Sequence, residues 1–462
     1  MALIKSISGF RGTIGGMAGD NLTPVDIVKF TAAFATFIME GSKGKDISIV
    51  LGRDARLSGD MVSNLVCGTL VAMGVTVIDA GLSTTPTIEM AVCDYKADGG
   101  IILTASHNPI QWNALKLLNK NGEFINAEQG QRVLELAESE FEFAPIESLG
   151  KYIKDSTAVD KHIDKILALD LVDVKAISEA DFSVAVDSVC STGGFVLKRL
   201  LSSLGVKKVI SINDEPTGIF AHNPEPLPEN ITEICQTVVS NGCDVGFVVD
   251  PDVDRLAIVC ENGEPFIEEY TLVAVADYVL SQSKGNTVSN LSSSRALRDV
   301  TELRGGQYNA ASVGEVNVVA MMKATNAVIG GEGNGGIIYP ALHYGRDALV
   351  GIALFLTYLA KKQMTCSSLR ATYPYYVISK NKIELTDGVD VDYILKQIAE
   401  KYKEQDVSTV DGVKINFPTN WVHLRKSNTE PIIRIYSESN TAEEANALAN
   451  SIIADIKVLI DK

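Results

Sequence analysis

Long hydrophobic runs are absent from this sequence. The longest apolar stretch, residues 348–360, is too short to cross a bilayer and predicts a buried helix. The opening residues, MALIKSISGFRG, lack the apolar core of a secretion signal. We therefore expect a cytoplasmic protein that has no membrane partner.

Positive charge is also in short supply. The chain has 41 Lys and Arg against 58 Asp and Glu, a formal net charge of −17. This acidic excess disfavours non-specific binding to DNA, RNA or anionic membranes. An anionic ligand would need Arg and Lys side chains that are gathered locally at its site.

Cysteines are few and are not arranged in pairs. There are seven of them, an odd number, and no CxxC motif occurs. Cys67, Cys93, Cys190 and Cys260 lie within apolar segments. This pattern predicts buried free thiols in a reducing cytoplasm rather than disulfides or a metal-binding Cys cluster.

The pattern of apolar segments repeats along the 462 residues, a length that suggests three or four domains at roughly 150 residues each. A strand, a polar turn, a helix and a second strand recur from residues 47, 182 and 286. The segment after Pro374 instead reads as α+β. We predict three similar α/β domains with mixed sheets, plus a smaller α+β C-terminal domain, around a central cleft. The expected boundaries are 1–150, 151–256, 257–370 and 371–462.

Each of the three copies leads to a further strand that ends in a distinctive loop. The loops are 104–109 (TASHNP), 250–255 (DPDVDR) and 330–336 (GGEGNGG). Ligands of open α/β sheets bind outside the carboxyl ends of strands. We therefore expect the three loops to meet at one cleft.

The first loop presents Ser106 after a buried strand. A serine in a turn is usually structural, and as a nucleophile it needs activation. A serine hydrolase is disfavoured, because adjacent residues such as Ser106 and His107 point apart in an extended loop and no GxSxG elbow is present.

The second loop places Asp250, Asp252 and Asp254 at alternate positions. In an extended segment their carboxylates share one side and form an oxygen site suited to Mg²⁺. An EF-hand is a poorer fit, because Arg255 occupies the required glycine position although Glu261 stands where the twelfth ligand would be. A haloacid-dehalogenase-like phosphatase, with Asp250 as nucleophile, would leave the serine loop without a role.

The third loop contains GxGxxG, but Pro340 argues against the helix that a dinucleotide fingerprint requires. Glu332 and Asn334 could hydrogen-bond the hydroxyls of a ligand; a plain glycine turn is the alternative. In the last domain, a phosphate dianion would suit a polar set comprising Arg425, Ser427, Asn428, Thr429 and Arg434. A surface loop with unrelated arginines is the alternative there.

Taken in order, these motifs resemble the α-D-phosphohexomutase family. The resemblance identifies 104–109 with the phosphoserine loop, 250–255 with the metal loop, 331–336 with the sugar loop and 425–431 with the phosphate loop. It implies that a phosphorylated serine gives its phosphoryl group to a hexose phosphate, through a hexose bisphosphate intermediate that also serves as activator.

The resemblance also implies a role for each candidate residue. Ser106, Asp250, Asp252 and Asp254 would hold one Mg²⁺ ion. Lys116 would be the general acid/base, supported by Arg11 and His107. Arg255 would lie beside the transferring group, Glu332 and Asn334 would bind sugar hydroxyls, and the last domain's loop would hold the non-reacting phosphate.

Three departures from the family pattern stand out. Ala114 follows Asn113 where a glycine is frequent, residues 313–317 lack a lysine, and Asn334 and Gly336 replace the serine and histidine of bacterial members. The variant is similar to the archaeal-type phosphoglucosamine mutases, and His343 would replace the missing loop histidine.

We therefore expect a phosphohexomutase, with glucosamine phosphate as the favoured substrate. The alternatives are a phosphomannomutase or phosphoglucomutase, and a sugar-phosphate-binding protein without turnover. The expected partners are small-molecule hexose or hexosamine phosphates, and the expected state is a monomer or homodimer.

Overall fold

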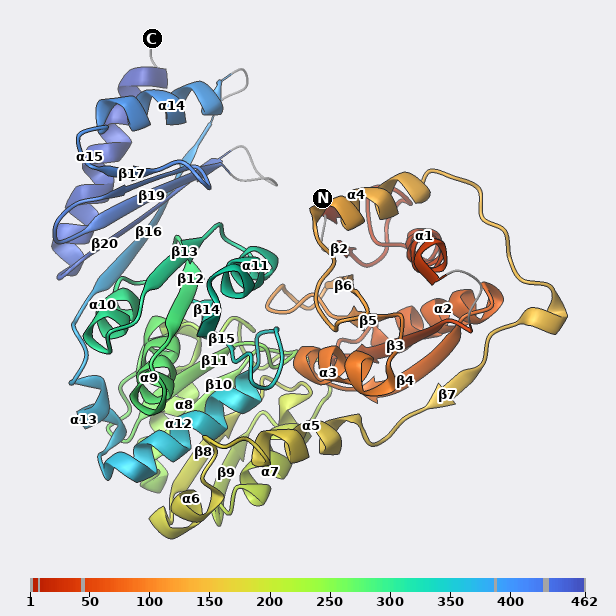
Figure 1. Cartoon of the computed structure of the whole chain (residues 1–462), viewed down its shortest axis with the longest axis horizontal. Helices are drawn as coiled ribbons and strands as arrows, with labels where there is room; N and C mark the ends of the chain where they lie inside the picture. The colour runs from red at the N-terminus through yellow and green to blue at the C-terminus, as the bar shows by residue number, and fades with distance from the viewer. Residues whose placement is uncertain (1–2, 7–8, 43–45, 386–388, 427–431, 461–462) are drawn as a thin grey trace.

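Four β-sheets follow one another along the chain (Figure 1). The computed structural model describes all residues except 1–2, 7–8, 43–45, 386–388, 427–431 and 461–462. The first three sheets mix parallel and antiparallel strands, whereas every pairing in the fourth is antiparallel.

The first sheet has seven strands in the order β1-β2-β6-β5-β3-β4-β7. Its strands are β1 (Ile4–Ser6), β2 (Gly9–Thr13), β3 (Ser48–Arg53), β4 (Thr76–Leu82), β5 (Gly99–Leu103), β6 (Trp112–Leu118) and β7 (Tyr152–Lys154). Its helices are α1 (Pro24–Ser42), α2 (Gly59–Ala72), α3 (Thr85–Tyr95) and α4 (Ala127–Leu136).

The second and third sheets repeat the centre of the first. The first sheet contains the order β6-β5-β3-β4. The second sheet has the corresponding order β11-β10-β8-β9, and the third has β15-β14-β12-β13. The strands are β8 (Ser183–Asp187), β9 (Lys208–Ile212), β10 (Val245–Val249), β11 (Leu256–Cys260), β12 (Asn286–Asn290), β13 (Tyr308–Ala311), β14 (Ala327–Glu332) and β15 (Gly336–Ile338). This repetition confirms three similar α/β domains.

The second and third domains share one hydrophobic core. Their helices are α5 (Ala158–Leu167), α6 (Val174–Ala180), α7 (Gly193–Ser203), α8 (Thr232–Asn241), α9 (Glu268–Gln282), α10 (Ala296–Leu303), α11 (Glu315–Thr325), α12 (Ala348–Lys362) and α13 (Cys366–Arg370). Of these, α8 and α11 pack in two smaller clusters instead. The core runs from α5 through α9 to α12, and α12 is buried from Ala348 to Leu359, as its apolar sequence predicts. The first and last domains each have a core of their own.

The last domain has the order β16-β20-β19-β18-β17, with two helices on one face (Figure 1). Its elements are β16 (Val377–Glu384), α14 (Val391–Lys401), β17 (Asp406–Ser408), β18 (Val413–Asn416), β19 (Trp421–Lys426), β20 (Ile432–Ser439) and α15 (Ala442–Ile460). The antiparallel sheet confirms the predicted α+β domain. The first sheet extends to Lys154 and the second to Cys260, a few residues past the boundaries expected at 150 and 256.

All seven cysteines are free. Cys260 is buried as expected, but Cys67 and Cys190 are only half-buried and Cys93 is exposed. The expectation for Cys93 is wrong because it lies in the last turn of α3, beyond Val92, where the buried part of that helix ends. Over the part of the chain that the structure describes, we find no helix with the length and apolarity of a membrane span.

Candidate active site

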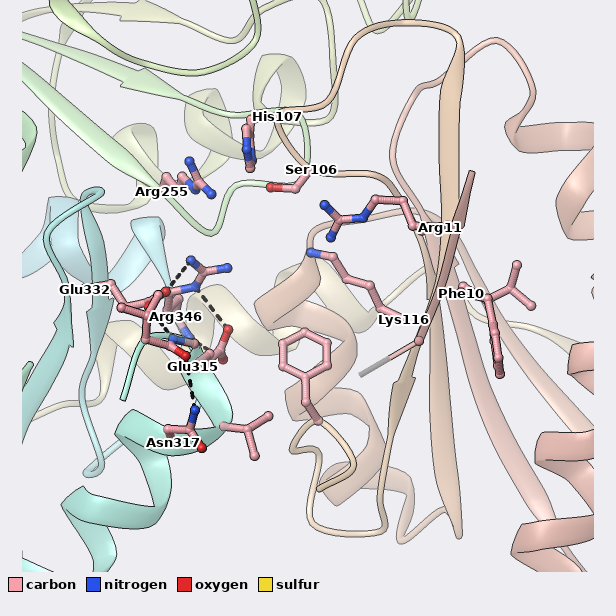
Figure 2. A pocket seen from close by; sticks show the side chains of 17 residues that line it. Phe10, Arg11, Ser106, His107, Lys116, Arg255, Glu315, Asn317, Glu332 and Arg346 are labelled. Atoms are coloured by element: carbon pink, nitrogen blue, oxygen red, sulfur yellow. Dashed lines mark hydrogen bonds and ion pairs between the residues drawn. The ribbon is translucent and has the colours of Figure 1, made fainter. Parts of the chain in front are cut away.

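A cavity of about 330 Å³ lies between the first three domains (Figure 2). The first domain lines it with Arg11, Ser106, His107 and Lys116, the second with Arg255, and the third with Glu315, Asn317, Glu332 and Arg346. In Figure 2, Ser106 and Lys116 point into the cavity from one side, and Arg346 and Glu332 lie opposite. The expected convergence of three strand ends is therefore confirmed.

Ser106 lies in a tight turn after the buried strand β5. Its φ of 49° is in the left-handed region, which is unfavourable for a residue with a Cβ. The side chain is buried, and its Oγ donates a 2.8 Å hydrogen bond to Asp250 Oδ2. Because the turn is not extended, Ser106 and His107 both reach the cavity rather than pointing apart, and the hydroxyl is directed at Asp250.

Arg56, which sequence reasoning missed, holds this turn through hydrogen bonds to its backbone carbonyls. Its side chain is buried, and Nε bonds Asp54 Oδ2 at 3.1 Å. The two remaining nitrogens donate to four backbone carbonyls, those of Ser106 (2.5 Å), Asn108 (2.6 Å), Pro109 (2.9 Å) and Trp112 (2.8 Å). The sequence could have indicated this contact, because Arg56 follows β3, the parallel neighbour of β5, and Ser106 follows β5.

The three aspartates of the second loop are buried, and one oxygen from each lies within 4.8 Å of the others. A turn with Val253 at φ 62° brings them together, rather than the extended segment that we expected. Asp250 Oδ1 accepts the amides of Asp254 and Arg255, both at 3.1 Å. Within the described structure, Asp252 Oδ1 and Asp254 Oδ1 have no hydrogen-bond partner. These buried carboxylate oxygens fit a hard cation such as Mg²⁺.

The pKa values of Asp250 and Asp252 are shifted in opposite directions. Burial and the nearby charges of Asp254 and Asp252 raise the pKa of Asp250 well above its ordinary value. Burial also acts to raise the pKa of Asp252, but the Lys116 ammonium outweighs it and the net shift is downward. Asp250, which also accepts the hydrogen bond of Ser106, therefore accepts a proton more readily than Asp252 does.

Lys116 and Arg11 project from neighbouring strands, β6 and β2. Arg11 pairs with Ala114, so Lys116, two residues further on, shares its face of the sheet. Arg11 lies in the middle of its strand. Lys116 Nζ is 2.7 Å from Asp252 Oδ2 and 3.7 Å from Asp254 Oδ2. Burial acts to lower the pKa of Lys116, yet these carboxylates raise it overall, and the ammonium keeps its proton.

His107 and Arg255 share a carboxylate that sequence reasoning missed. Arg255 Nη1 donates to Glu225 Oε1 at 2.9 Å, and His107 Nε2 lies 4.0 Å from the same oxygen. Burial, followed by the positive charges of Arg255 and Arg11, lowers the pKa of His107 to about 2. His107 is therefore a neutral hydrogen-bonding group.

Glu332 is the last residue of β14, not part of a loop as expected, and its carboxylate is tightly held. Oε1 accepts from Asn290 at 2.9 Å and from the Gly314 amide at 3.1 Å. Burial acts to raise the pKa of Glu332, but Arg346 lowers it overall. Asn334 lies in the following turn, where its Nδ2 is 3.5 Å from Glu332 Oε2.

Sequence reasoning also missed the role of Arg346. Its guanidinium reaches Asp254 Oδ2 (2.7 Å), Glu315 Oε2 (3.0 Å) and Glu332 Oε2 (2.8 Å). Residues 313–317 line the cavity without a lysine, and Arg346 supplies positive charge on that side. Gly336 permits this approach, because a Cβ there would lie 2.3 Å from Arg346 Cδ.

His343 does not line the cavity, contrary to the role expected for it. Its Nε2 lies 3.3 Å from Asp347 Oδ2 and its Nδ1 3.3 Å from Glu89 Oε2. The ring therefore belongs to a separate buried cluster behind the cavity.

In the last domain, Arg425 and Arg434 face each other directly across β19 and β20. Arg434 is exposed, and Arg425 Nε lies 2.9 Å from Asp411 Oδ2. Like charges in a cross-strand pair are destabilising unless an anion lies between them. The other candidates, Ser427, Asn428 and Thr429, lie outside the described residues.

Sequence comparisons agree with this geometry. Four models of the phosphoglucomutase/phosphomannomutase family match in order: α/β/α domain I at residues 4–143, domain II at 160–263, domain III at 268–376 and the C-terminal domain at 382–454. The chain therefore belongs to the phosphoglucomutase/phosphomannomutase family, whose members named as mutases are isomerases that move a phosphoryl group.

Individual relatives span nearly the whole chain. A protein of Thermococcus kodakarensis named phosphoglucomutase/phosphomannomutase is 36% identical over 94% of this chain and 95% of its own length. A phosphoglucosamine/phosphogalactosamine mutase of Sulfurisphaera tokodaii is 33% identical over 96% and 97%. A Burkholderia thailandensis structure of a phosphoglucomutase/phosphomannomutase family protein shows the same fold, with a TM-score of 0.83 and 24% identity over 99% and 98% of the two chains.

Proposed function

We propose that this chain interconverts the 6-phosphate and 1-phosphate of a hexosamine through a phosphoserine at Ser106 and a bisphosphate intermediate. One observation carries the proposal: the buried Ser106 hydroxyl is held on Asp250 at the wall of a cavity whose other wall presents Glu332 and Arg346. A binding protein without turnover would have no use for a serine in that setting.

The aspartate loop fits the metal that this chemistry needs. Asp250, Asp252 and Asp254, together with a phosphate oxygen on Ser106, would hold one Mg²⁺ ion. When bound, the ion supplies positive charge that neutralises the oxygens of the transferring group. Among the described residues, no group hydrogen-bonds the buried Oδ1 atoms of Asp252 and Asp254, and this supports the assignment.

Two groups can exchange the protons of the reaction. When the bisphosphate returns its phosphoryl group, the bond from phosphorus to the sugar oxygen breaks and a bond to Ser106 Oγ forms. The Ser106 proton passes to Asp250, which accepts its hydrogen bond, and the departing sugar oxygen takes a proton from Lys116. The other half-reaction reverses both transfers, so the cycle balances.

The remaining residues bind and orient the substrate. Arg11, His107 and Arg255 surround the serine, while Glu332 and Asn334 would bind sugar hydroxyls in either orientation of the bisphosphate. The set Arg425, Ser427, Asn428, Thr429 and Arg434 would hold the non-reacting phosphate. The opposed pair of Arg425 and Arg434 supports an anion there.

The substrate choice rests on the names of relatives. Several archaeal relatives are named probable phosphoglucosamine mutases, including one from Methanopyrus kandleri that is 29% identical over 98% of this chain. The alternative is a phosphomannomutase or phosphoglucomutase, because the Thermococcus kodakarensis relative is named phosphoglucomutase/phosphomannomutase. We further propose a cytoplasmic location, which the seven free cysteines support, and a monomeric or homodimeric state.

Side-by-side turnover of glucosamine, mannose and glucose 6-phosphates, with Mg²⁺ and a trace of the hexose bisphosphate, tests the proposal. We expect glucosamine phosphate to be preferred, turnover to vanish in Ser106→Ala, and phosphopeptide mapping to find phosphate on Ser106. A preference for mannose or glucose phosphate would change only the substrate. Phosphate on Asp250, or no turnover with an unmodified serine, would overturn the mechanism.

A further inference from the structure

The cluster that contains His343 lies where the first three domains meet. His162 Nε2 is 2.9 Å and His343 Nε2 is 3.3 Å from the same atom, Asp347 Oδ2. The three ligand-type atoms all lie within 4.8 Å of one another. His162 comes from α5, whereas His343 and Asp347 precede α12, and none of the three is used by the proposed reaction.

Each of these side chains is oriented by a further partner. Thr87 Oγ1 lies 2.9 Å from His162 Nδ1, and Glu89 Oε2 lies 3.3 Å from His343 Nδ1. Asp347 Oδ1 caps α12 by accepting the amides of Leu349 and Val350, which leaves Oδ2 for the two imidazoles. Ligand histidines of metal sites are held in this way, with the second ring nitrogen bonded to a carboxylate or another oxygen.

The cluster also contains two buried carboxylates whose charge needs a positive partner. Glu89 and Asp347 are almost completely buried, with exposed fractions of 1% and 0%. In the described structure Glu89 Oε1 has no hydrogen-bond partner, and Glu89 Oε2 has only the 3.3 Å contact with His343 Nδ1. Gly345 allows the crowding, because a Cβ there would lie 1.8 Å from Glu89 Oε2. Positive charge beside such a buried carboxylate pair stabilises it, and either a proton on His343 or a metal ion can supply that charge.

We propose that His162, His343 and Asp347 form a second metal site, which binds a divalent transition ion of the Zn²⁺ type. Two imidazole nitrogens and one carboxylate oxygen suit that class of ion, with water available as the fourth ligand. Mg²⁺ prefers oxygen ligands alone and is suited instead to the aspartate loop. The ion would join the second and third domains, and through Glu89 and Thr87 it would also fix α3 of the first.

The site has a direct structural link to the catalytic cavity. Thr85, two residues before Thr87 on α3, donates to Asp252 Oδ2 at 2.5 Å, and its amide donates to the Asp252 carbonyl at 2.9 Å. An ion that holds α3 in place therefore also helps to position the aspartate loop. Its role is structural, so it should be retained when the catalytic metal is removed.

Metal analysis of the full-length protein tests the proposal. Protein purified without chelators should contain about one zinc per chain, and after exchange into Co²⁺ it should show the visible absorption of a tetrahedral cobalt site. Both signals should be lost in His162→Gln and His343→Gln and kept in Asp252→Asn, which alters the other site. Glu89→Gln changes only a partner of His343 and should weaken Co²⁺ binding by about 10- to 100-fold.

Because a ligand variant could fail to fold, the wild-type protein provides an independent test. Zinc should raise the melting temperature of the chelator-treated protein, and the same concentration of Mg²⁺ should not reproduce the effect. A wild-type protein that holds no zinc, shows no cobalt absorption and gains no stability from zinc would overturn the proposal, as would equal zinc binding by correctly folded His162→Gln. In either case the cluster would be an ion-pair network completed by a proton on His343.

Discussion

Arg346 Nη2 lies 2.7 Å from Asp254 Oδ2, so a side chain of the third domain completes the aspartate loop of the second. The other oxygen of Asp254 stays free of hydrogen bonds within the described residues. One face of the carboxylate is thus held by a fixed cation, and the other remains available to a metal.

Replacing Arg346 should therefore destabilise the protein as well as inactivate it. Arg346→Gln leaves Asp254, Glu315 and Glu332 buried without their shared partner, which should cost at least about 3–5 kcal/mol. Denaturant unfolding and kcat measure the two effects. The control is Arg199→Gln, which breaks an exposed ion pair with Asp160 and should cost about 1 kcal/mol or less. Similar losses in both variants would contradict the role given to Arg346.

Arg56 should act mainly through the position of Ser106. In Arg56→Gln the carbonyls that it holds are released, and Asp54 loses its buried partner. A displaced serine should lower kcat by about 100-fold, with a smaller effect on KM. The matched control is Arg53→Gln, three residues earlier, whose partner Asp60 is exposed. An Arg56→Gln enzyme with wild-type kcat would show that the turn at Ser106 keeps its conformation without Arg56.

The backbone at Ser106 allows the cost of its conformation to be measured separately from catalysis. Ser106→Ala and Ser106→Gly should both be inactive. At φ 49°, however, glycine avoids a cost of about 1–2 kcal/mol that alanine retains, so the glycine variant should be the more stable of the two. Comparing their free energies of unfolding tests this order. Equal stability would mean that the turn relaxes when the hydroxyl is removed.

Lys414 should make stability depend on pH in the alkaline range. Burial lowers its pKa from 10.5 to about 8. Between these values the unfolded chain binds more protons than the folded one, so the contribution of Lys414 to stability rises with pH, by up to about 1.4 kcal/mol per unit. The stability of the wild type relative to Lys414→Met should therefore increase from pH 8 to 10.5. The same replacement at Lys396, which is exposed, provides the matched surface control.

Local sequence patterns predicted most of the architecture. Alternating strand and helix segments gave the three repeats. The polar residues at the strand ends gave Ser106 and Glu332 as cavity residues, and Asp250 as the partner of Ser106. Ligands bind at the carboxyl ends of strands in α/β domains, which is why the ends of three separate sheets could be expected at one cleft.

What the sequence did not reveal are contacts between residues that lie far apart in the chain. Arg346 and Arg56 have no distinctive spacing, and their importance comes from partners that are distant in sequence. His343 was assigned to the cavity because a histidine was missing nearby in sequence. The structure instead turns its ring toward Glu89, 254 positions earlier in the chain, which no local pattern could indicate.

The shared core of the second and third domains has a consequence for heat inactivation. Those two domains should melt as one cooperative unit, while the first domain, with a core of its own, forms another. The cavity lies at the interface between the two units. A relative movement of the units would therefore separate the active-site residues while every sheet was still intact. Catalysis should then fail at a lower temperature than circular dichroism reports, and substrate that bridges the interface should protect activity more than it protects secondary structure.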